Sequence, residues 1–220
     1  YSRDVKKLVS YLEENEIISS PILIQLEDIQ QFIYSISSNL NARSQARLIS
    51  GLRNFFDYLV FEDYRKENPT DLIETPKIGR KLPDTLSLKE IDELISSIDL
   101  SKPQGERNRT ILETLYSCGL RVSELINLQL SDLFFEEGFI RVIGKGNKQR
   151  FVPINLQTQK YISFYVNDIR SHIAIQKGFE DTVFLNRRGK KLTRVMIFTI
   201  VKDLATKIDL KKKISPHTFR

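Results

Sequence analysis

The chain contains little of what disulfides, zinc sites and membrane spans require. A single cysteine, Cys118, excludes an internal disulfide and is typical of a reducing, cytoplasmic setting. The two histidines and this cysteine are too scattered to predict a zinc site. No apolar run approaches the length of a membrane span, and no segment is repeated or of low complexity. With 40% hydrophobic and 28% charged residues, the chain is predicted to be a globular cytoplasmic protein without metal or membrane.

Positive charge is concentrated in the second part of the chain. Residues 1–80 hold ten Lys and Arg against twelve Asp and Glu, a net charge of −2. The remaining residues hold 24 against 16, a net charge of +8. A basic region of this kind indicates a polyanionic partner such as DNA or RNA, although many proteins without such a partner are also basic.

Residues 1–75 are predicted to be helical throughout. The strongest amphipathic pattern has apolar residues at three- and four-residue steps, at Leu48, Leu52, Phe55, Phe56 and Leu59. This stripe predicts packing against neighbouring helices. Arg43, Arg47 and Arg53 lie elsewhere on the same segment, where they could reach phosphates or remain in solvent.

Residues 76–86 predict a linker between two domains. Prolines at 76 and 83, a glycine and three positive charges follow one another without periodicity. A second domain, 87–220, then opens with Ser87 and Glu90 in the spacing of a capping box.

The second domain is predicted to be mainly helical with a small antiparallel β-sheet. Helices are expected at about 107–117, ending at Gly119, and at about 122–128. A β-hairpin is expected from 139–143 and 150–154, around a glycine-rich basic turn. A long helix ending near Gly178, a short strand at 183–185 and a helix capped by Thr193 that runs through Val201 complete the prediction.

Three groups of residues have the chemistry of a phosphodiester site. Arg121 and Glu124, three apart near a predicted helix start, could form a surface ion pair or an anion site. The anion site is favoured because a cation at a helix start is otherwise unfavourable. Lys145 lies between two glycines, where it could be solvated or enter a groove and reach a leaving oxygen.

The third group is His217 and Arg220, also three apart. Arginine suits phosphate because its planar guanidinium can bind two phosphate oxygens, and histidine can move a proton near neutral pH. Together the groups predict a site that holds a phosphodiester and protonates its leaving oxygen.

In combination these segments resemble the tyrosine site-specific recombinases of the phage-integrase family, most closely the bacterial Xer type. The resemblance is carried by residues 119–125 (GLRVSEL), 142–153 (VIGKGNKQRFVP) and 215–220 (SPHTFR). The linker and the first helix, around Asp4 and Leu8, also fit. The resemblance covers nearly the whole chain, in order, and it implies a helical core-type DNA-binding domain (1–75) followed by an α+β catalytic domain (87–220).

The resemblance also implies roles for individual residues. Arg121 and Arg220 would clamp the scissile phosphate, Lys145 would protonate the leaving 5′-oxygen, and His217 would assist proton transfer. Glu124 would support the site. The expected DNA contacts are Arg43, Arg47, Lys148 and Arg150. No cofactor is implied, because a covalent phosphotyrosyl intermediate conserves the energy of the broken bond.

The nucleophilic tyrosine of the family is not found in this chain. All eight tyrosines precede His217, whereas the family nucleophile follows the His-x-x-Arg motif. We therefore expect the catalytic domain to be incomplete at its C-terminal end, and these 220 residues alone not to cleave DNA.

The implied partners are double-stranded DNA, related recombinase subunits in a tetramer on two DNA sites, and a septal DNA translocase. Chromosome dimer resolution is the corresponding function. The alternatives are an integrase of a mobile element, a type IB topoisomerase relative, a non-catalytic DNA-binding module, and a helical interaction protein. The uneven charge disfavours the last of these.

Overall fold

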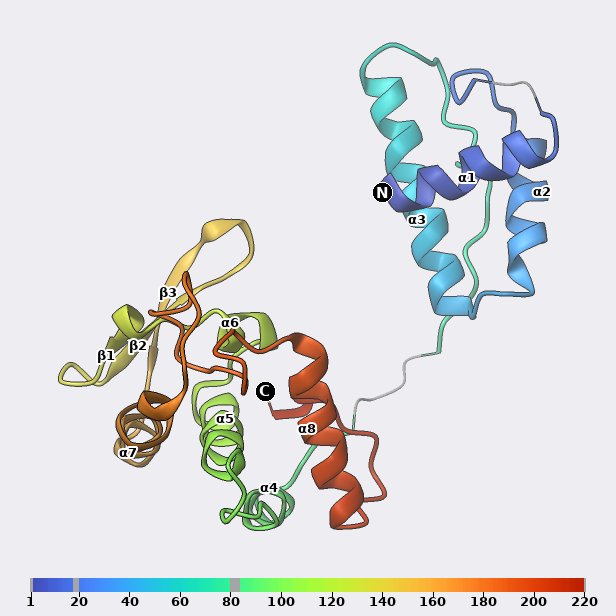
Figure 1. Cartoon of the computed structure of the whole chain (residues 1–220). Coiled ribbons are helices and arrows are strands. Elements are labelled where there is room, and N and C mark those ends of the chain that lie inside the picture. Colours follow the sequence, from blue (N-terminus) through green and yellow to red (C-terminus); the bar gives the residue numbers. More distant parts are fainter. Residues whose placement is uncertain (1, 18–19, 80–83, 220) are drawn as a thin grey trace. The chain divides into compact units, whose positions relative to one another are not determined.

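The computed structural model describes residues 2–17, 20–79 and 84–219. The chain divides into two compact units, Tyr1–Lys81 and Leu82–Arg220 (Figure 1). Each unit has its own hydrophobic core. The elements are mainly helices, and the single three-stranded sheet in the described part is antiparallel, so the predicted fold class is confirmed. Among the described residues, no helix combines the length and the apolar character that crossing a membrane requires.

The described residues of the first unit form three helices, α1 (Ser2–Glu14), α2 (Leu26–Ser37) and α3 (Ala42–Phe61). The side chain of Asn41 caps α3 by accepting a hydrogen bond from the Ser44 amide at 2.9 Å. The predicted apolar stripe of α3 is confirmed as the centre of the core. The buried core residues of the three helices are Leu8, Leu12, Ile29, Phe32, Leu48, Ile49, Leu52, Phe56 and Leu59.

The prediction that helices continue to residue 75 is wrong after Phe61. Residues 62–79 form turns and extended chain, of which Asn68, Thr70 and Ile73 are buried. Pro69 lacks the amide that a continuing helix would need. Some carbonyl oxygens of this segment, which a helix would bond to its own amides, instead accept hydrogen bonds from Arg53. Its guanidinium donates to the carbonyl oxygens of Thr70 (3.4 Å) and Ile73 (3.0 Å).

The second unit begins with the predicted capping box. The Glu90 amide donates to the Ser87 hydroxyl at 3.3 Å, and the Ser87 amide donates to the Glu90 carboxylate at 2.7 Å. Helix α4 (Leu88–Ser96) follows, and then α5 (Gly105–Cys118), which the core surrounds. Gly119 ends α5 in the left-handed conformation (φ 56°, ψ 37°), as predicted, and turns the chain into the short helix α6 (Val122–Ile126).

The predicted hairpin consists of β2 (Phe139–Ile143) and β3 (Gln149–Pro153). A strand that was not predicted, β1 (Leu133–Phe134), pairs with the other side of β2. Two residues are too few to show a strand-like alternation. The buried side chains of Ile140 and Val142 place one face of this sheet on the core.

The helix after the hairpin is shorter and less regular than predicted. Helix α7 (Leu156–Phe164) continues as a π-helical turn (Tyr165–Ile169) and a 3-10 turn (Arg170–His172), so it ends before Gly178. Thr193 caps α8 (Arg194–Lys207) as predicted, accepting a hydrogen bond from the Met196 amide at 3.2 Å, but α8 runs beyond Val201.

The predicted strand at 183–185 is wrong. Only isolated bridges occur there, between Gln129 and Thr182 and between Leu185 and Lys191. The segment is fully buried, and buried carbonyl groups need donors. Two buried arginines supply them: Arg107 donates to the Leu185 carbonyl oxygen, and Arg170 donates to those of Thr182 and Glu180.

The next loop depends on a close approach at Gly189. This glycine has a φ of +69°, and an added Cβ would overlap the carbonyl oxygen of Ala174. Gly178 has a similar requirement for positive φ (+90°), but an added Cβ there meets no atom within 4 Å.

We therefore expect Gly189→Ala to lower the free energy of unfolding by more than Gly178→Ala. Gly178→Ala should cost about 1–2 kcal/mol, the penalty of the left-handed conformation. Gly189→Ala should cost at least about 3 kcal/mol, because backbone overlap adds to that penalty. Urea unfolding of both variants measures the difference, and equal losses would contradict the close approach.

Candidate catalytic site

Arg121 is held at the start of α6 by its own helix. Arg121 is the N-cap residue; its amide donates to Oε2 of Glu124 at 2.8 Å, and its guanidinium Nη1 donates to Oε1 of Glu124 at 2.9 Å. The Arg121 side chain remains 48% exposed. The ion pair of the two residues is therefore present, but its carboxylate is buried, and about half of the Arg121 side chain remains accessible to an anion.

Glu124 is the buried centre of the site. Its side chain is 2% exposed, and it also accepts two hydrogen bonds from Arg150, Nη1 to Oε1 at 2.7 Å and Nη2 to Oε2 at 2.8 Å. The hydrogen bonds from Arg150, and then those from Arg121, lower the pKa of Glu124 from its ordinary 4.5 to about 2, against an opposing contribution from burial. Glu124 is therefore a carboxylate across the physiological pH range.

Lys145 lies at the exposed tip of the β2–β3 hairpin, as predicted. The turn Lys145–Asn147 is a short 3-10 turn in which Gly146 (φ 72°) and Asn147 (φ 59°) are left-handed. The Gly144 amide donates to the Lys148 carbonyl oxygen at 2.8 Å and closes the base of the turn. The sequence thus presents the ammonium group of Lys145 to solvent on a narrow, closed loop.

His217 is exposed on a 3-10 turn, Pro216–Phe219, and not on the α-helix that its spacing with Arg220 suggested. Pro216 and Phe219 are buried and anchor this turn against α5 and α8. Helix α6, which carries Arg121, packs against the same two helices. Arg220 lies outside the described residues.

The four expected DNA contacts are found in different surroundings. Arg43 and Lys148 are exposed. Arg47 is also exposed, but its Nη2 donates to Oδ1 of the buried Asp4 at 2.9 Å. Arg150 turns inward to Glu124. The structure therefore gives Arg47 and Arg150 protein partners that the sequence did not indicate.

A polar cavity of about 450 Å³ lies between α6, the sheet and the segment around Gly178. Glu124 and Asp132 contribute negative charge to its lining, and Arg141 and Lys191 contribute positive charge. Arg141 is paired with the buried Asp132 at 2.7 Å. The charges of the cavity are thus largely balanced within the protein. No group of three or more His, Cys, Asp or Glu side chains in the described part of the chain could hold a metal ion.

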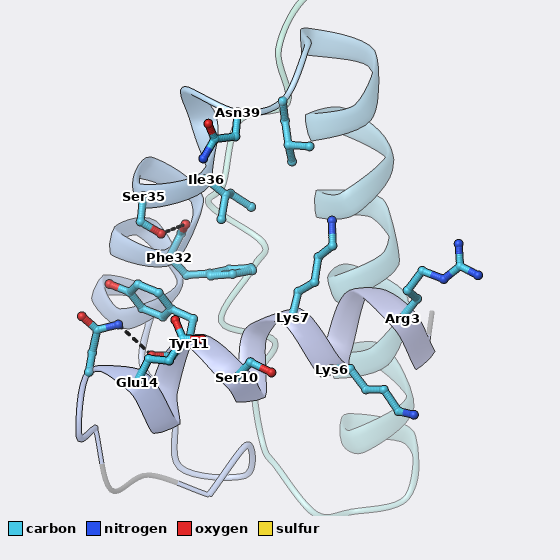
Figure 2. Close-up of a pocket in the computed structure, with 12 residues that line it drawn as sticks. Arg3, Lys6, Lys7, Ser10, Tyr11, Glu14, Phe32, Ser35, Ile36 and Asn39 are labelled. Atoms are coloured by element: carbon cyan, nitrogen blue, oxygen red, sulfur yellow. Dashed lines mark hydrogen bonds between the residues drawn. The ribbon is translucent and has the colours of Figure 1, made fainter.

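The first unit has a cavity of about 710 Å³ between α1 and α2 (Figure 2). Tyr11 and Phe32 form its apolar side, with ring centroids 5.3 Å apart. Arg3, Lys6 and Lys7 of α1 are among the residues that line it, and Figure 2 shows the Lys7 side chain extending from α1 on the side where Phe32 lies. This basic edge was not predicted, although its spacing of three and four residues in the sequence could have indicated it.

The low pKa of Glu124 predicts how stability depends on pH. A carboxylate whose pKa is lower in the folded state stabilises the fold above its unfolded pKa, and this contribution is lost as the pH falls toward the folded pKa. Above pH 5, we expect the free energy of unfolding of the wild-type protein to be about 3 kcal/mol higher than that of Glu124→Gln. This difference should shrink as the pH falls from 4.5 to 2.

Chemical unfolding of both proteins at several pH values measures this difference. Glu136→Gln replaces an exposed carboxylate of the β1–β2 turn and serves as the control. Its free energy of unfolding should stay close to that of the wild-type protein at each pH. A difference between wild type and Glu124→Gln that is constant from pH 7 to pH 3 would contradict the pairing.

Comparison with known families gives two matches. Residues 84–220 match the phage integrase family, and residues 1–63 match the phage integrase N-terminal SAM-like domain. The tyrosine recombinase XerD of Staphylococcus saprophyticus subsp. saprophyticus is 42% identical over 221 aligned residues, which cover all of this chain and 74% of that protein.

Solved structures show the same fold. A XerH site-specific recombinase bound to a palindromic difH substrate, in a post-cleavage complex, superposes with a TM-score of 0.78 at 20% identity. That match covers all of this chain and 65% of the XerH chain. The Tn1549 transposon integrase in complex with circular intermediate DNA gives a TM-score of 0.73 at 21% identity, over 97% of this chain and 76% of the integrase. The chain therefore belongs to the phage integrase family, as a tyrosine recombinase of the Xer type.

Proposed function

We propose that this chain is the DNA-binding and phosphate-activating part of a site-specific recombinase that resolves chromosome dimers in the cytoplasm. The observation that carries the proposal is the arrangement at Arg121. A buried carboxylate fixes this arginine from behind, and about half of its side chain faces solvent. Such a fixed cation can stabilise the charge that develops on a phosphate without reorganising first.

In the proposed reaction, a tyrosine oxygen attacks the scissile phosphorus and the bond to the 5′-oxygen breaks. Arg121 and Arg220 bind the non-bridging oxygens, and Lys145 gives its proton to the departing 5′-oxygen. His217 assists proton transfer by accepting the proton that the attacking tyrosine hydroxyl loses. The product is a 3′-phosphotyrosyl link and a free 5′-hydroxyl. Attack by the 5′-hydroxyl of another strand reverses these steps and rejoins the DNA without a cofactor. The role of Arg220 rests on its motif alone.

The attacking tyrosine is proposed to come from a part of the protein outside these 220 residues. All the tyrosines here precede His217, and Tyr165 is buried with its hydroxyl bonded to the Leu185 amide at 3.1 Å. The chain spans only 74% of the XerD relative and 65% of the XerH chain, which leaves room for such a segment.

The two units are proposed to bind duplex DNA as a helical core-binding domain and a catalytic domain. Exposed cations support this assignment on both: Arg3, Lys6, Lys7 and Arg43 on the first, and Lys145 and Lys148 on the second. Because XerH and the Tn1549 integrase were solved on DNA, we infer a duplex partner here as well. Four subunits on two DNA sites, with a septal DNA translocase as regulator, complete the proposal.

A mobile-element integrase is the second candidate. The likeness to the Tn1549 integrase rests on fold alone, whereas the XerD relative is 42% identical over the whole chain. This difference favours the Xer assignment.

Lys145→Ala in the full-length recombinase tests catalysis against DNA binding alone. Loss of a general acid should slow formation of the covalent protein–DNA adduct by about 10²–10⁴-fold at saturating DNA. Lys148→Ala, on the same hairpin, is the matched control. Removing a phosphate contact should weaken binding, and lower the slope of log affinity against log salt by about 1, without slowing cleavage at saturation. Equal effects of the two substitutions on binding, with cleavage unchanged in both, would mean that Lys145 only contacts the DNA backbone and is not the general acid. Absence of any adduct with the wild-type full-length protein would indicate a non-catalytic DNA-binding module.

A further inference from the structure

Arg150 occupies a position in the sheet where an apolar residue is expected. Along β3, Arg150 and Val152 are partly buried, whereas Gln149, Phe151 and Pro153 between and beside them are exposed. Arg150 is the cross-strand partner of the buried Val142. A charged group on the core face of a sheet is unfavourable unless it has a partner of opposite charge. Glu124 on α6 is that partner.

The geometry of the Arg150–Glu124 pair can fix the position of β3 relative to the start of α6. Both terminal nitrogens of Arg150 bind the two oxygens of Glu124, at 2.7 and 2.8 Å, so the planar guanidinium fixes both the distance and the orientation. The same two oxygens also bind the amide and the guanidinium of Arg121. One buried carboxylate thus joins β3 to the start of α6.

The connection extends to the base of the Lys145 turn. A Cβ added to Gly144 would lie 3.6 Å from Oε1 of Glu124 and 3.8 Å from Nη1 of Arg150, so the backbone before Lys145 lies beside the pair, with little more than the width of a methyl group between them. The Gly144 amide in turn bonds the Lys148 carbonyl oxygen across the turn. A shift of Arg150 would therefore shift the base of the loop that carries Lys145.

We propose that Arg150 is a positioning residue of the recombinase, which acts through Glu124 to hold the Lys145 hairpin in place relative to Arg121. This inference rests on the proposed function, because it concerns how Lys145 is placed as the proton donor. It differs from the expectation that Arg150 contacts DNA. In this role Arg150 touches neither the DNA nor the reacting atoms.

Protonation of the leaving 5′-oxygen can be tested separately from phosphate binding and DNA binding by a chemical change in the DNA. With ordinary DNA, the 5′-oxygen must receive a proton as its bond to phosphorus breaks. When sulfur replaces this bridging oxygen, the thiolate is stable near neutral pH and leaves without a proton. A defect in the placement of Lys145 should therefore be relieved by sulfur, whereas a defect in phosphate binding or DNA binding should remain.

The experiment measures single-turnover formation of the covalent adduct by the full-length recombinase on both DNAs. We expect Arg150→Lys, which keeps the charge but loses the two-pronged geometry, to slow cleavage of ordinary DNA by about 10²-fold. On sulfur-containing DNA its rate should return to within about tenfold of wild type, in parallel with Lys145→Ala.

Arg141→Gln is the matched control. Arg141 belongs to the same sheet and pairs with a buried carboxylate, Asp132, at 2.7 Å, but in the described structure no hydrogen bond or ion pair joins its side chain to Glu124 or the Lys145 turn. This variant should cleave both DNAs at nearly the wild-type rate.

A wild-type rate for Arg150→Lys on ordinary DNA, or equal slowing on both DNAs, would overturn the role of Arg150. If sulfur fails to rescue Lys145→Ala itself, the general-acid assignment in the proposed function is wrong, whatever Arg150 does. Hydrogen exchange of the Gly144 amide gives a test that does not depend on cleavage. Exchange should be faster in Arg150→Lys than in wild type or Arg141→Gln, and an unchanged rate would contradict the proposal.

Discussion

The buried carboxylate of Glu124 is the group on which the geometry of the site depends. A carboxylate that loses its water is unfavourable by several kcal/mol unless hydrogen bonds and opposite charge replace it. Here the replacement comes from one backbone amide and two guanidinium groups on different elements, α6 and β3. These elements cannot separate without exposing an unpaired charge in the interior, so the start of α6 and the hairpin behave as one piece.

Arginine has a second structural use in this fold. Arg53, Arg107 and Arg170 each donate to backbone carbonyl oxygens of irregular segments that run through a core. Such segments lack the ladder of a helix or sheet, so side chains must supply the missing donors. The positive charge of the chain is therefore only partly available to a polyanion, and composition alone overstates the basic surface.

The exposed residues proposed to contact the DNA phosphate share one property: each presents a polar side chain to solvent from a backbone that its neighbours hold in place. Arg121 is bonded to Glu124 and keeps about half of its side chain exposed, Lys145 lies at the tip of a closed turn, and His217 lies on a turn anchored by its buried neighbours. In each case a rigid support lies behind an open polar group. This arrangement suits a site that acts by positioning and charge.

The sequence alone determined the elements that depend on residues close together in the chain. The capping box at Ser87, the end of α5 at Gly119 and the β2–β3 hairpin depend on neighbours in the chain, and all three were predicted correctly. The motifs also identified the family. The tertiary structure alone decided that residues 183–185 form no strand, and that Arg150 turns to a carboxylate 26 positions away. The physical reason is that a charged side chain pairs with a group on whichever element the fold brings close to it. The residues next to it in the sequence do not indicate which element that will be.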